Sequence, residues 1–214
     1  LEFIRDEQVF ATLLTPEGYG RDDSRWDMWR IEEFNEILGF YGLCYWYAWQ
    51  VSILGLGPIW MGNNEQQKHL AASKLQEGGI FAFALSEKEH GADLYSSEMT
   101  LTPQGDGTYR ANGDKYYIGN GNEAALVSVF GKNTETDEYV WFTVDPRHEC
   151  YSCNKIDTSG VRQAYVATIE IRDYPIKPEQ ILSEGSDAWD SALNTVNVGK
   201  YQLGWASIGI CTHS

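Results

Sequence analysis

The sequence predicts an α+β protein in which an N-terminal helical domain is followed by an antiparallel β-barrel or β-sandwich and then by the start of a C-terminal helical domain. Three observations predict this order: apolar residues at helical spacing before residue 79, short apolar runs separated by glycine-rich turns from residue 80, and a return of helical spacing after Pro178. Helices and strands that are segregated along a chain are typical of α+β proteins with more than one domain. We therefore divide the chain into residues 1–79, 80–183 and 184–214.

Two helices are predicted before residue 64. Between Trp29 and Leu38 the apolar side chains recur at helical spacing, whereas the glutamates fall elsewhere. The stretch from Ile37 to Asn64 contains no charged residue. Glycines and Pro58 interrupt this stretch and its aromatic residues lie in its middle, so we interpret it as a buried helix of a bundle and not as a membrane span. We expect that helix to break at residues 55–59.

A third helix is predicted over residues 64–77. This segment consists of good helix formers and is followed by Gly78-Gly79, a common C-terminal stop. Asn64 precedes the first helical residue and is expected to be its N-cap.

The pattern changes to strands at Ile80. Residues 80–85 form a short apolar run, and Asn112-Gly113 lies between two strand-like segments, which predicts a two-residue hairpin turn. Residues 125–130, 139–144 and 165–171 continue the series. Many short strands without intervening helices predict an antiparallel sheet or barrel.

The last segment has the spacing of an amphipathic helix. Its stripe consists of Trp189, Leu193, Val196, Lys200, Leu203, Ser207 and Ile210. Asp187 and Asp190 lie in the first turn, where the helix dipole favours anions. Lys200 interrupts the apolar stripe and is explained either by its ammonium reaching solvent or by contact with an anionic ligand. Because the chain begins at Leu1 and ends within this helix, we interpret it as an excerpt.

The composition excludes some classes of partner. The formal net charge is −15, which disfavours nucleic acid and anionic membrane surfaces. Four cysteines are too few for a disulfide scaffold, so a reducing compartment is expected. We expect the cytoplasm, or the mitochondrial matrix if the source is eukaryotic. Cys150 and Cys153, with His148 upstream, have the spacing of metal or redox ligands, but no second pair completes a site. We interpret them as plain thiols and assign no metal.

Two segments have the composition of a ligand site. Residues 86–93 follow the first strand directly, and Gly91 permits a close approach of the backbone to a ligand. The alternative is a solvated acidic loop. In residues 115–121, two tyrosines beside glycines could form a wall for a planar ring, although one of the two could equally belong to the core.

In this order, residues 81–93 and 105–121 resemble the middle domain of the acyl-CoA dehydrogenase family. That family has Thr-Glu-Pro, a short glycine stretch and Gly-Ser-Asp, then Asn-Gly-x-Lys, an aromatic pair and Ile-Thr-Asn-Gly. Residues 57–59 and 62–68 resemble its N-terminal helical domain. Leu193-Asn194 with Lys200 and Gly204 resemble the opening of its C-terminal helical domain.

The resemblance implies FAD as the cofactor and gives each segment a role. The implied cofactor-binding residues are Phe83, Leu85, Ser86, Gly91, Ala92, Tyr117, Ile118 and Gly119; the implied substrate-binding residues are Ala92, Asn197 and Lys200. Ser86 keeps a hydroxyl where the family has threonine. Three positions depart from the family: Ala92 replaces a serine, Gly119 replaces a threonine that meets the flavin, and Lys200 replaces an arginine that reaches the CoA phosphates.

The implied function is that of an FAD-dependent oxidoreductase of fatty acid β-oxidation. Such an enzyme removes the α-proton of an acyl-CoA with a carboxylate base while the β-hydride passes to flavin, which gives a trans-2-enoyl-CoA. The base belongs to a part of the family outside residues 1–214, so no catalytic residue is assigned. The implied partners are the acyl-CoA substrate, an electron-transfer flavoprotein and further copies of the chain in a dimer or tetramer.

Two alternatives remain open. An acyl-CoA oxidase would keep the fold but reoxidise its flavin with oxygen. A non-catalytic paralogue would use the same fold as a binding subunit, and the substitutions at Ala92 and Gly119 are compatible with it.

Overall fold

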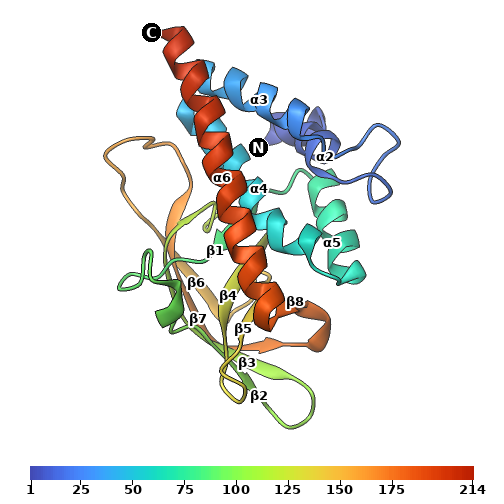
Figure 1. Cartoon of the computed structure of the whole chain (residues 1–214), viewed down its shortest axis with the longest axis vertical. Coiled ribbons are helices and arrows are strands. Elements are labelled where there is room, and N and C mark those ends of the chain that lie inside the picture. The colour runs from blue at the N-terminus through green and yellow to red at the C-terminus, as the bar shows by residue number, and fades with distance from the viewer.

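The computed structural model describes all 214 residues and confirms the predicted fold class (Figure 1). Five helices come first and occupy one end of the molecule. They are α1 (Glu2–Asp6), α2 (Val9–Leu14), α3 (Met28–Tyr41), α4 (Leu43–Met61) and α5 (Glu65–Gln76). Eight strands form the other end, and the long helix α6 (Gly185–His213) runs along both ends (Figure 1).

The strands form one sheet. They are β1 (Phe81–Ala84), β2 (Thr100–Pro103), β3 (Tyr109–Gly119), β4 (Leu126–Asn133), β5 (Tyr139–Val144), β6 (Tyr151–Lys155), β7 (Val166–Ile176) and β8 (Ile181–Glu184). Their order is β6-β7-β3-β2-β4-β5-β8, with β1 paired to β4. The two ends of this path do not pair, so the sheet is not a closed barrel and the sandwich alternative holds. Most pairs are antiparallel as expected, but β4 runs parallel to both β1 and β2.

The predicted hairpin at Asn112-Gly113 is wrong, because β3 continues through this dipeptide. The chain reverses earlier, between β2 and β3, where Gln104 N donates to Thr108 O at 2.9 Å. Asn112-Gly113 instead coincides with a shift of register between β3 and β7. Gly113 has φ 151°, and a Cβ atom there would lie 2.9 Å from Met99 Cα, so glycine is required by a bulge and a close approach of neighbouring backbone.

The predicted break at residues 55–59 is also wrong, because α4 continues to Met61. The glycines of this helix are contact points. A Cβ atom on Gly55 would lie 2.8 Å from Ala82 N, and one on Gly57 would lie 2.6 Å from Thr195 Oγ1. They let α4 approach β1 and α6 closely, and Pro58 is buried inside the helix.

Asn64 is the N-cap of α5, as predicted. Its Oδ1 accepts a hydrogen bond from Gln67 N at 3.1 Å. Its Nδ2 donates to Glu179 O and Ile181 O, at 2.9 and 2.8 Å. The cap therefore also fastens α5 to the segment that leads into β8.

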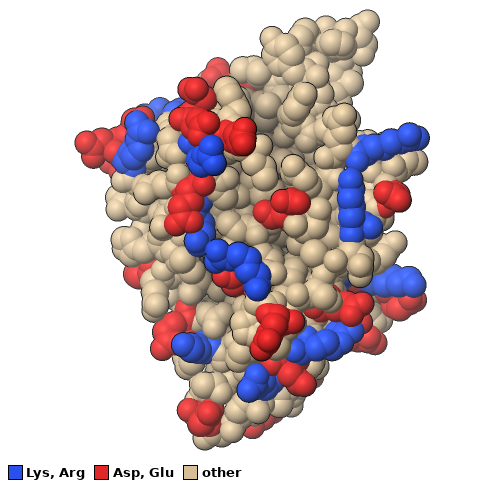
Figure 2. Space-filling model, turned by 180° about the vertical axis from the view of Figure 1, so that it is seen from behind, with Lys and Arg blue, Asp and Glu red and all other residues tan.

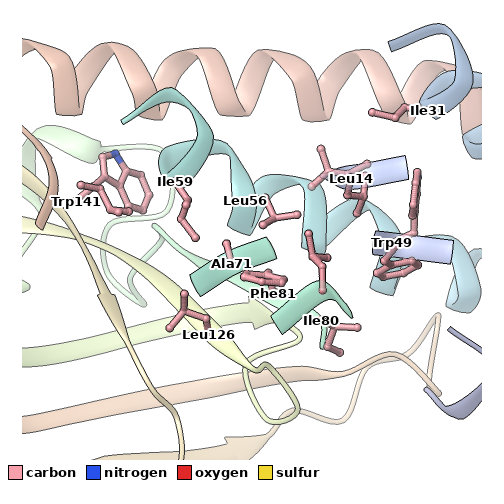
Figure 3. Packing of buried hydrophobic residues seen from close by; sticks show 14 of the residues in the cluster. Leu14, Ile31, Trp49, Leu56, Ile59, Ala71, Ile80, Phe81, Leu126 and Trp141 are labelled. Atoms are coloured by element: carbon pink, nitrogen blue, oxygen red, sulfur yellow. The ribbon is translucent and has the colours of Figure 1, made fainter. Parts of the chain in front are cut away.

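The helices and the sheet share a core that lies between α4 and the sheet (Figure 3). Trp49, Leu56 and Ile59 from α4 pack with Phe81 from β1 and Trp141 from β5, and all five are fully buried. A second core, centred on Val127, Val129 and Phe142, lies within the sheet end of the molecule. No helix is long and apolar enough to cross a membrane. The proposed boundaries after residues 79 and 183 stay predictions.

Helix α6 is confirmed, but its packing face differs from the apolar stripe. Leu193 and Leu203 of that stripe are 41% and 50% exposed. The buried face consists of small or polar residues: Ala188, Ser191, Ala192, Thr195, Gly199, Gln202, Ala206 and Gly209. Small side chains allow α6 to approach α3 so closely that Gly39 faces the backbone of Ala206. In Figure 2, the C-terminal end of this helix projects as a spur without charged side chains.

Candidate functional site

The structure brings the two predicted site segments together. Ser86 lies two residues after the end of β1, and Tyr116 lies near the end of β3. Tyr116 N donates to Ser86 O at 3.0 Å, and Ser86 Oγ donates to Tyr116 O at 3.0 Å. The Ser86 hydroxyl hydrogen is thus engaged within the protein, while its oxygen lone pairs remain available to accept a hydrogen bond.

The start of the loop after β1 is fixed by a buried ion pair that the sequence did not reveal. Lys115 Nζ lies 2.8 Å from Glu87 Oε1, and the two side chains are almost fully buried. Lys115 also donates to Leu85 O at 2.8 Å. Glu87 accepts further hydrogen bonds from Ser97 Oγ and from the backbone of Glu98 and Met99. Glu87 is therefore a structural anchor, and the interpretation of this position as a solvated carboxylate is wrong.

The electrostatics of this pair favour two charged groups at neutral pH. Burial opposes ionisation of Glu87, but the ammonium of Lys115 and the hydrogen-bond donors outweigh it and lower the pKa of Glu87. Burial lowers the pKa of Lys115 to about 8, although Glu87 acts in the opposite direction. Because its oxygens are already engaged by several donors, Glu87 is unsuited to act as a general base.

Beyond this anchor, the loop opens to solvent. Gly91 and Ala92 are exposed, and a Cβ atom on Gly91 would meet no atom within 4 Å. The backbone N–H groups of Gly91, Ala92 and Asp93 donate to no acceptor in the protein. Consecutive free N–H groups at a glycine can bind the oxygen or nitrogen acceptors of a ligand.

The end of β3 bulges at Tyr117. The register against β7 shifts between Lys115 and Ile118, and Tyr117 has φ 63°. This left-handed conformation is costly for a bulky residue and is characteristic of functional sites. It turns Tyr117 outward, where 52% of its surface is exposed, while Ile118 and Gly119 are buried. Of the two tyrosines, Tyr117 is therefore the one whose ring faces solvent, and its role as a wall for a planar ring stays a prediction.

Asn120 fixes this end of β3 to its neighbours, a role that was not predicted from the sequence. Its side chain is fully buried, and Nδ2 donates to Ala48 O, Ser52 Oγ and Phe81 O at 3.1, 3.3 and 2.9 Å. Its backbone has φ 59°, a conformation that asparagine tolerates better than most residues. Its place between Gly119 and Gly121 is the one feature of the sequence that could have indicated a left-handed backbone at this position.

Phe83 and Leu85, which were also predicted to bind the cofactor, are engaged in contacts within the protein. The Phe83 ring stacks on the Trp141 ring, with centroids 5.0 Å apart. Trp141 is itself fully buried and donates to Ala188 O. The Phe83 side chain therefore belongs to the core behind the site, and the Leu85 carbonyl is occupied by Lys115.

Asn197 and Lys200 lie on α6 and are exposed. Neither side chain takes part in a hydrogen bond or an ion pair within the protein. Helix α6 does reach the loop at its first half, where Trp189 stacks on Tyr95 with ring centroids 4.6 Å apart.

Two groups of potential metal ligands are not suited to a metal. Ligand atoms of Glu87, His90 and Glu98 lie within 4.8 Å of one another, but Glu87 is already paired with Lys115. His148 and the cysteines at 150 and 153 do not form such a group. Instead, His148 Nδ1 accepts a hydrogen bond from Cys150 N at 3.1 Å, and all cysteines are free thiols.

Comparison with known proteins identifies the part of the chain that contains both segments. Residues 82–174 match the family model described as acyl-CoA dehydrogenase, middle domain. This part of the chain is similar to the middle domain of the acyl-CoA dehydrogenase family. Both the open loop at residues 88–93 and the bulge at Tyr117 fall inside the matched range.

Similar proteins extend the match beyond residues 82–174. The short-chain specific acyl-CoA dehydrogenase of Megasphaera elsdenii is 27% identical over 158 residues, covering 72% of this chain and 41% of that protein. Butyryl-CoA dehydrogenase from the same organism superposes with a TM-score of 0.89 at 24% identity, over 99% of this chain and 58% of that chain. A glutaryl-CoA dehydrogenase from Mycobacterium smegmatis, solved with FADH2, gives 0.86 at 19% identity, over 97% and 53%. At these structural identities the likeness shows the fold, and this chain spans about half the length of these proteins.

Proposed function

We propose that this chain holds the flavin of an FAD-dependent enzyme that converts an acyl-CoA into a trans-2-enoyl-CoA. The observation that carries the proposal is the pairing of Ser86 with Tyr116, which sets the open loop beside the outward-facing Tyr117. The site lies within the range that matches the family, and a similar fold has been solved with FADH2.

The residues present fit a flavin. The exposed ring of Tyr117 offers a face for a planar ring system, and the free N–H groups of Gly91 and Ala92 offer donors to its polar edge. Ser86 offers a hydroxyl oxygen and Gly119 a backbone without a side chain. Leu85, Ile118 and Phe83 support these groups from the protein side. When bound, FAD would accept the hydride that leaves the β-carbon of the substrate.

The acyl-CoA would be bound by Ala92 and by α6. Ala92 lies in the open loop, next to the proposed flavin edge, and its small side chain leaves room for a substrate. Lys200 and Asn197 lie three residues apart on the exposed face of α6, so one turn of helix presents an ammonium and an amide together. An ammonium binds a phosphate as a point charge, which suits the phosphates of CoA.

We place the α-proton base outside residues 1–214. Glu87, the buried carboxylate of the site, is paired with Lys115 and faces the loop interior. The chain's own contribution would be to hold the flavin and the substrate in the relative orientation that hydride transfer requires. We further propose an electron-transfer flavoprotein as electron acceptor, a homo-oligomeric assembly, and a reducing compartment such as the cytoplasm or mitochondrial matrix.

The proposal is tested on the longest natural form of the protein that contains residues 1–214. After purification with added FAD, we expect bound flavin whose visible absorption is bleached by acyl-CoA under anaerobic conditions. A set of straight-chain acyl-CoAs would be compared with free CoA as the control. Flavin uptake without bleaching by any acyl-CoA would favour the non-catalytic paralogue, and failure to bind flavin would refute the proposal.

A second measurement separates the dehydrogenase from the oxidase. The bleached enzyme is mixed with oxygenated buffer and, separately, with an electron-transfer flavoprotein. We expect rapid recovery of the flavin absorption only with the flavoprotein. Rapid recovery with oxygen, together with oxygen consumption during turnover, would identify an acyl-CoA oxidase instead.

A further inference from the structure

Helix α4 contacts the end of β3 at Gly119. A Cβ atom on Gly119 would lie 2.6 Å from Val51 Cγ2, 2.9 Å from Tyr47 Cε1 and 3.0 Å from Tyr47 Oη. These distances are too short for a side chain at residue 119 unless the α4 side chains move. The Tyr47 ring therefore occupies the volume that a side chain of residue 119 would take, and its hydroxyl lies at that position.

The Tyr47 hydroxyl has no partner within the protein. The side chain is half-buried, and its hydroxyl is not sealed from solvent. Burial, with a smaller contribution from the nearby Tyr117, raises the pKa of Tyr47 to about 12. The hydroxyl thus keeps its proton at neutral pH and is free to donate it to an acceptor outside the chain.

Hydrogen bonds from Asn120 connect the part of α4 next to Tyr47 with the end of β3. Asn120 Nδ2 donates to Ala48 O, the residue that follows Tyr47, and to Phe81 O in β1. Tyr117 is held in the left-handed conformation two residues before Gly119. A strained, outward-facing aromatic residue and a free hydroxyl from another element therefore lie next to one another at one edge of the site.

We propose that Tyr47 is a flavin contact, and that its hydroxyl donates a hydrogen bond to an acceptor on the flavin edge that lies beside Gly119. This inference rests on the proposed binding of flavin at Tyr117–Gly119. The hydroxyl group is thus supplied by α4 and not by residue 119, whose lack of a side chain makes room for it. A change in the packing of α4 against β3 would therefore also move the hydroxyl that contacts the flavin.

The first test replaces Tyr47 by Phe in the longest natural form of the protein, which removes the hydroxyl and keeps the ring. We expect the dissociation constant for FAD, measured by quenching of flavin fluorescence, to rise about 3- to 10-fold, as for the loss of one hydrogen bond. The flavin absorption bands should also shift. Tyr45→Phe is the matched control, since Tyr45 is on the same helix and 66% exposed.

The second test measures the exchange of volume between residues 47 and 119. Gly119→Ser should lower the melting temperature in the wild-type background and have a smaller effect in the Tyr47→Ala background, because the small residue leaves room. The double variant Tyr47→Ala, Gly119→Ser should bind FAD more tightly than Tyr47→Ala alone, since it restores a hydroxyl.

The outcomes separate this inference from the function on which it rests. If the wild-type protein takes up no FAD, both the proposed function and this inference are wrong. If the wild type binds FAD and Tyr47→Phe binds it equally tightly with an unchanged spectrum, the function stands and only the Tyr47 contact is refuted. Equal thermal effects of Gly119→Ser in both backgrounds would also contradict the contact.

Discussion

Lys115 Nζ and Glu87 Oε1 lie 2.8 Å apart in the interior, behind the loop that follows β1. Removing one member of a buried pair leaves an uncompensated charge, which costs about 3–5 kcal/mol. We therefore expect Lys115→Met, which keeps the aliphatic stem, to lower the free energy of unfolding by about that amount in urea titrations. Addition of Glu87→Gln should restore part of the loss, because the second charge is then also removed.

The control for this prediction is Lys132→Met. Lys132 Nζ is 4.0 Å from Asp137 Oδ1, whose side chain is 91% exposed. Exposed pairs contribute at most about 1 kcal/mol. If both lysine variants unfold at the same urea concentration, the pair at Lys115 is not the anchor that its burial indicates.

A second prediction concerns Asn120, which joins β3, β1 and α4. Asn120→Ala removes three hydrogen bonds and leaves buried acceptors unpaired, in a backbone conformation that alanine disfavours. We expect a loss of about 3 kcal/mol or more in the free energy of unfolding. Asn154→Ala, at an exposed position of β6, serves as the control. A melting temperature equal to that of the control would show that Asn120 does not tie these elements together.

The sequence predicted those elements whose signals are local. Residues 139–144 were expected as a strand and form β5 with the same bounds, since a short run of β-branched and aromatic residues needs no distant information. Asn64 was recognised as an N-cap because the capping hydrogen bond spans only three residues.

The failures have a common physical cause, which is that the deciding partner is distant in sequence. Asn112-Gly113 has the composition of a hairpin, but packing against Met99 and pairing with β7 turn it into a bulge. The glycines of α4 were read as a break, although β1 and α6 need the space that they leave. The burial of α6 was assigned to its large apolar residues, whereas close contact with α3 selects its small ones.

The candidate site could likewise be predicted only in part from the sequence. The two segments were found from their residue types, and the structure sets them beside each other through Ser86 and Tyr116. The burial of Lys115 could not be foreseen, because its partner Glu87 lies 28 residues away. Tyr47 belongs to an apolar helix whose sequence gives no indication of which face meets β3.

A third prediction concerns Ser86, the proposed hydroxyl contact of the flavin. Ser86→Ala removes an acceptor for the ligand and also the hydrogen bond to Tyr116 O. We expect FAD to be retained less tightly by about 0.5–1.5 kcal/mol, with a shift of its absorption spectrum. Ser152→Ala, at an exposed position of β6, is the control. Unchanged flavin content and spectrum in Ser86→Ala would remove this residue from the proposed site.

A fourth prediction concerns Glu32, a residue of α3 that is only 2% exposed. Its Oε2 accepts a hydrogen bond from Asn35 at 3.0 Å, while Oε1 has no partner. Burial raises the pKa of Glu32 to about 7, and Asn35 opposes this effect. In the unfolded chain the pKa would be about 4.3.

The sign of the pH dependence follows from these two pKa values. Between about pH 4.3 and 7 the folded chain binds a proton at Glu32 that the unfolded chain has lost, so this group destabilises the fold increasingly as pH rises through that window. Glu32→Gln should therefore gain stability relative to wild type from pH 5 to pH 8, by up to about 3 kcal/mol. Glu33→Gln, at an exposed position of the same helix, is the control. A constant difference between Glu32→Gln and wild type across this range would contradict the raised pKa.

The last prediction concerns Lys200, the proposed phosphate contact on α6. The side chain is exposed and has no ion-pair partner, so its charge is available to a ligand, and the structure gives it no role in packing. Lys200→Met should therefore leave the melting temperature unchanged. If Lys200 binds a CoA phosphate, the same variant should lose about 1.5–3 kcal/mol of acyl-CoA binding, as for other hydrogen bonds to charged groups. Lys200→Arg should bind the ligand at least as well as wild type, because the guanidinium keeps the charge and adds a second donor.

The measurement is the dissociation constant for an acyl-CoA in all three proteins at low and high salt, with Lys155→Met, an exposed lysine on β6, as the control. The difference between Lys200→Met and wild type should shrink at high salt, because salt screens exposed charges. Equal binding by all the proteins at low salt would mean that Lys200 only extends into solvent.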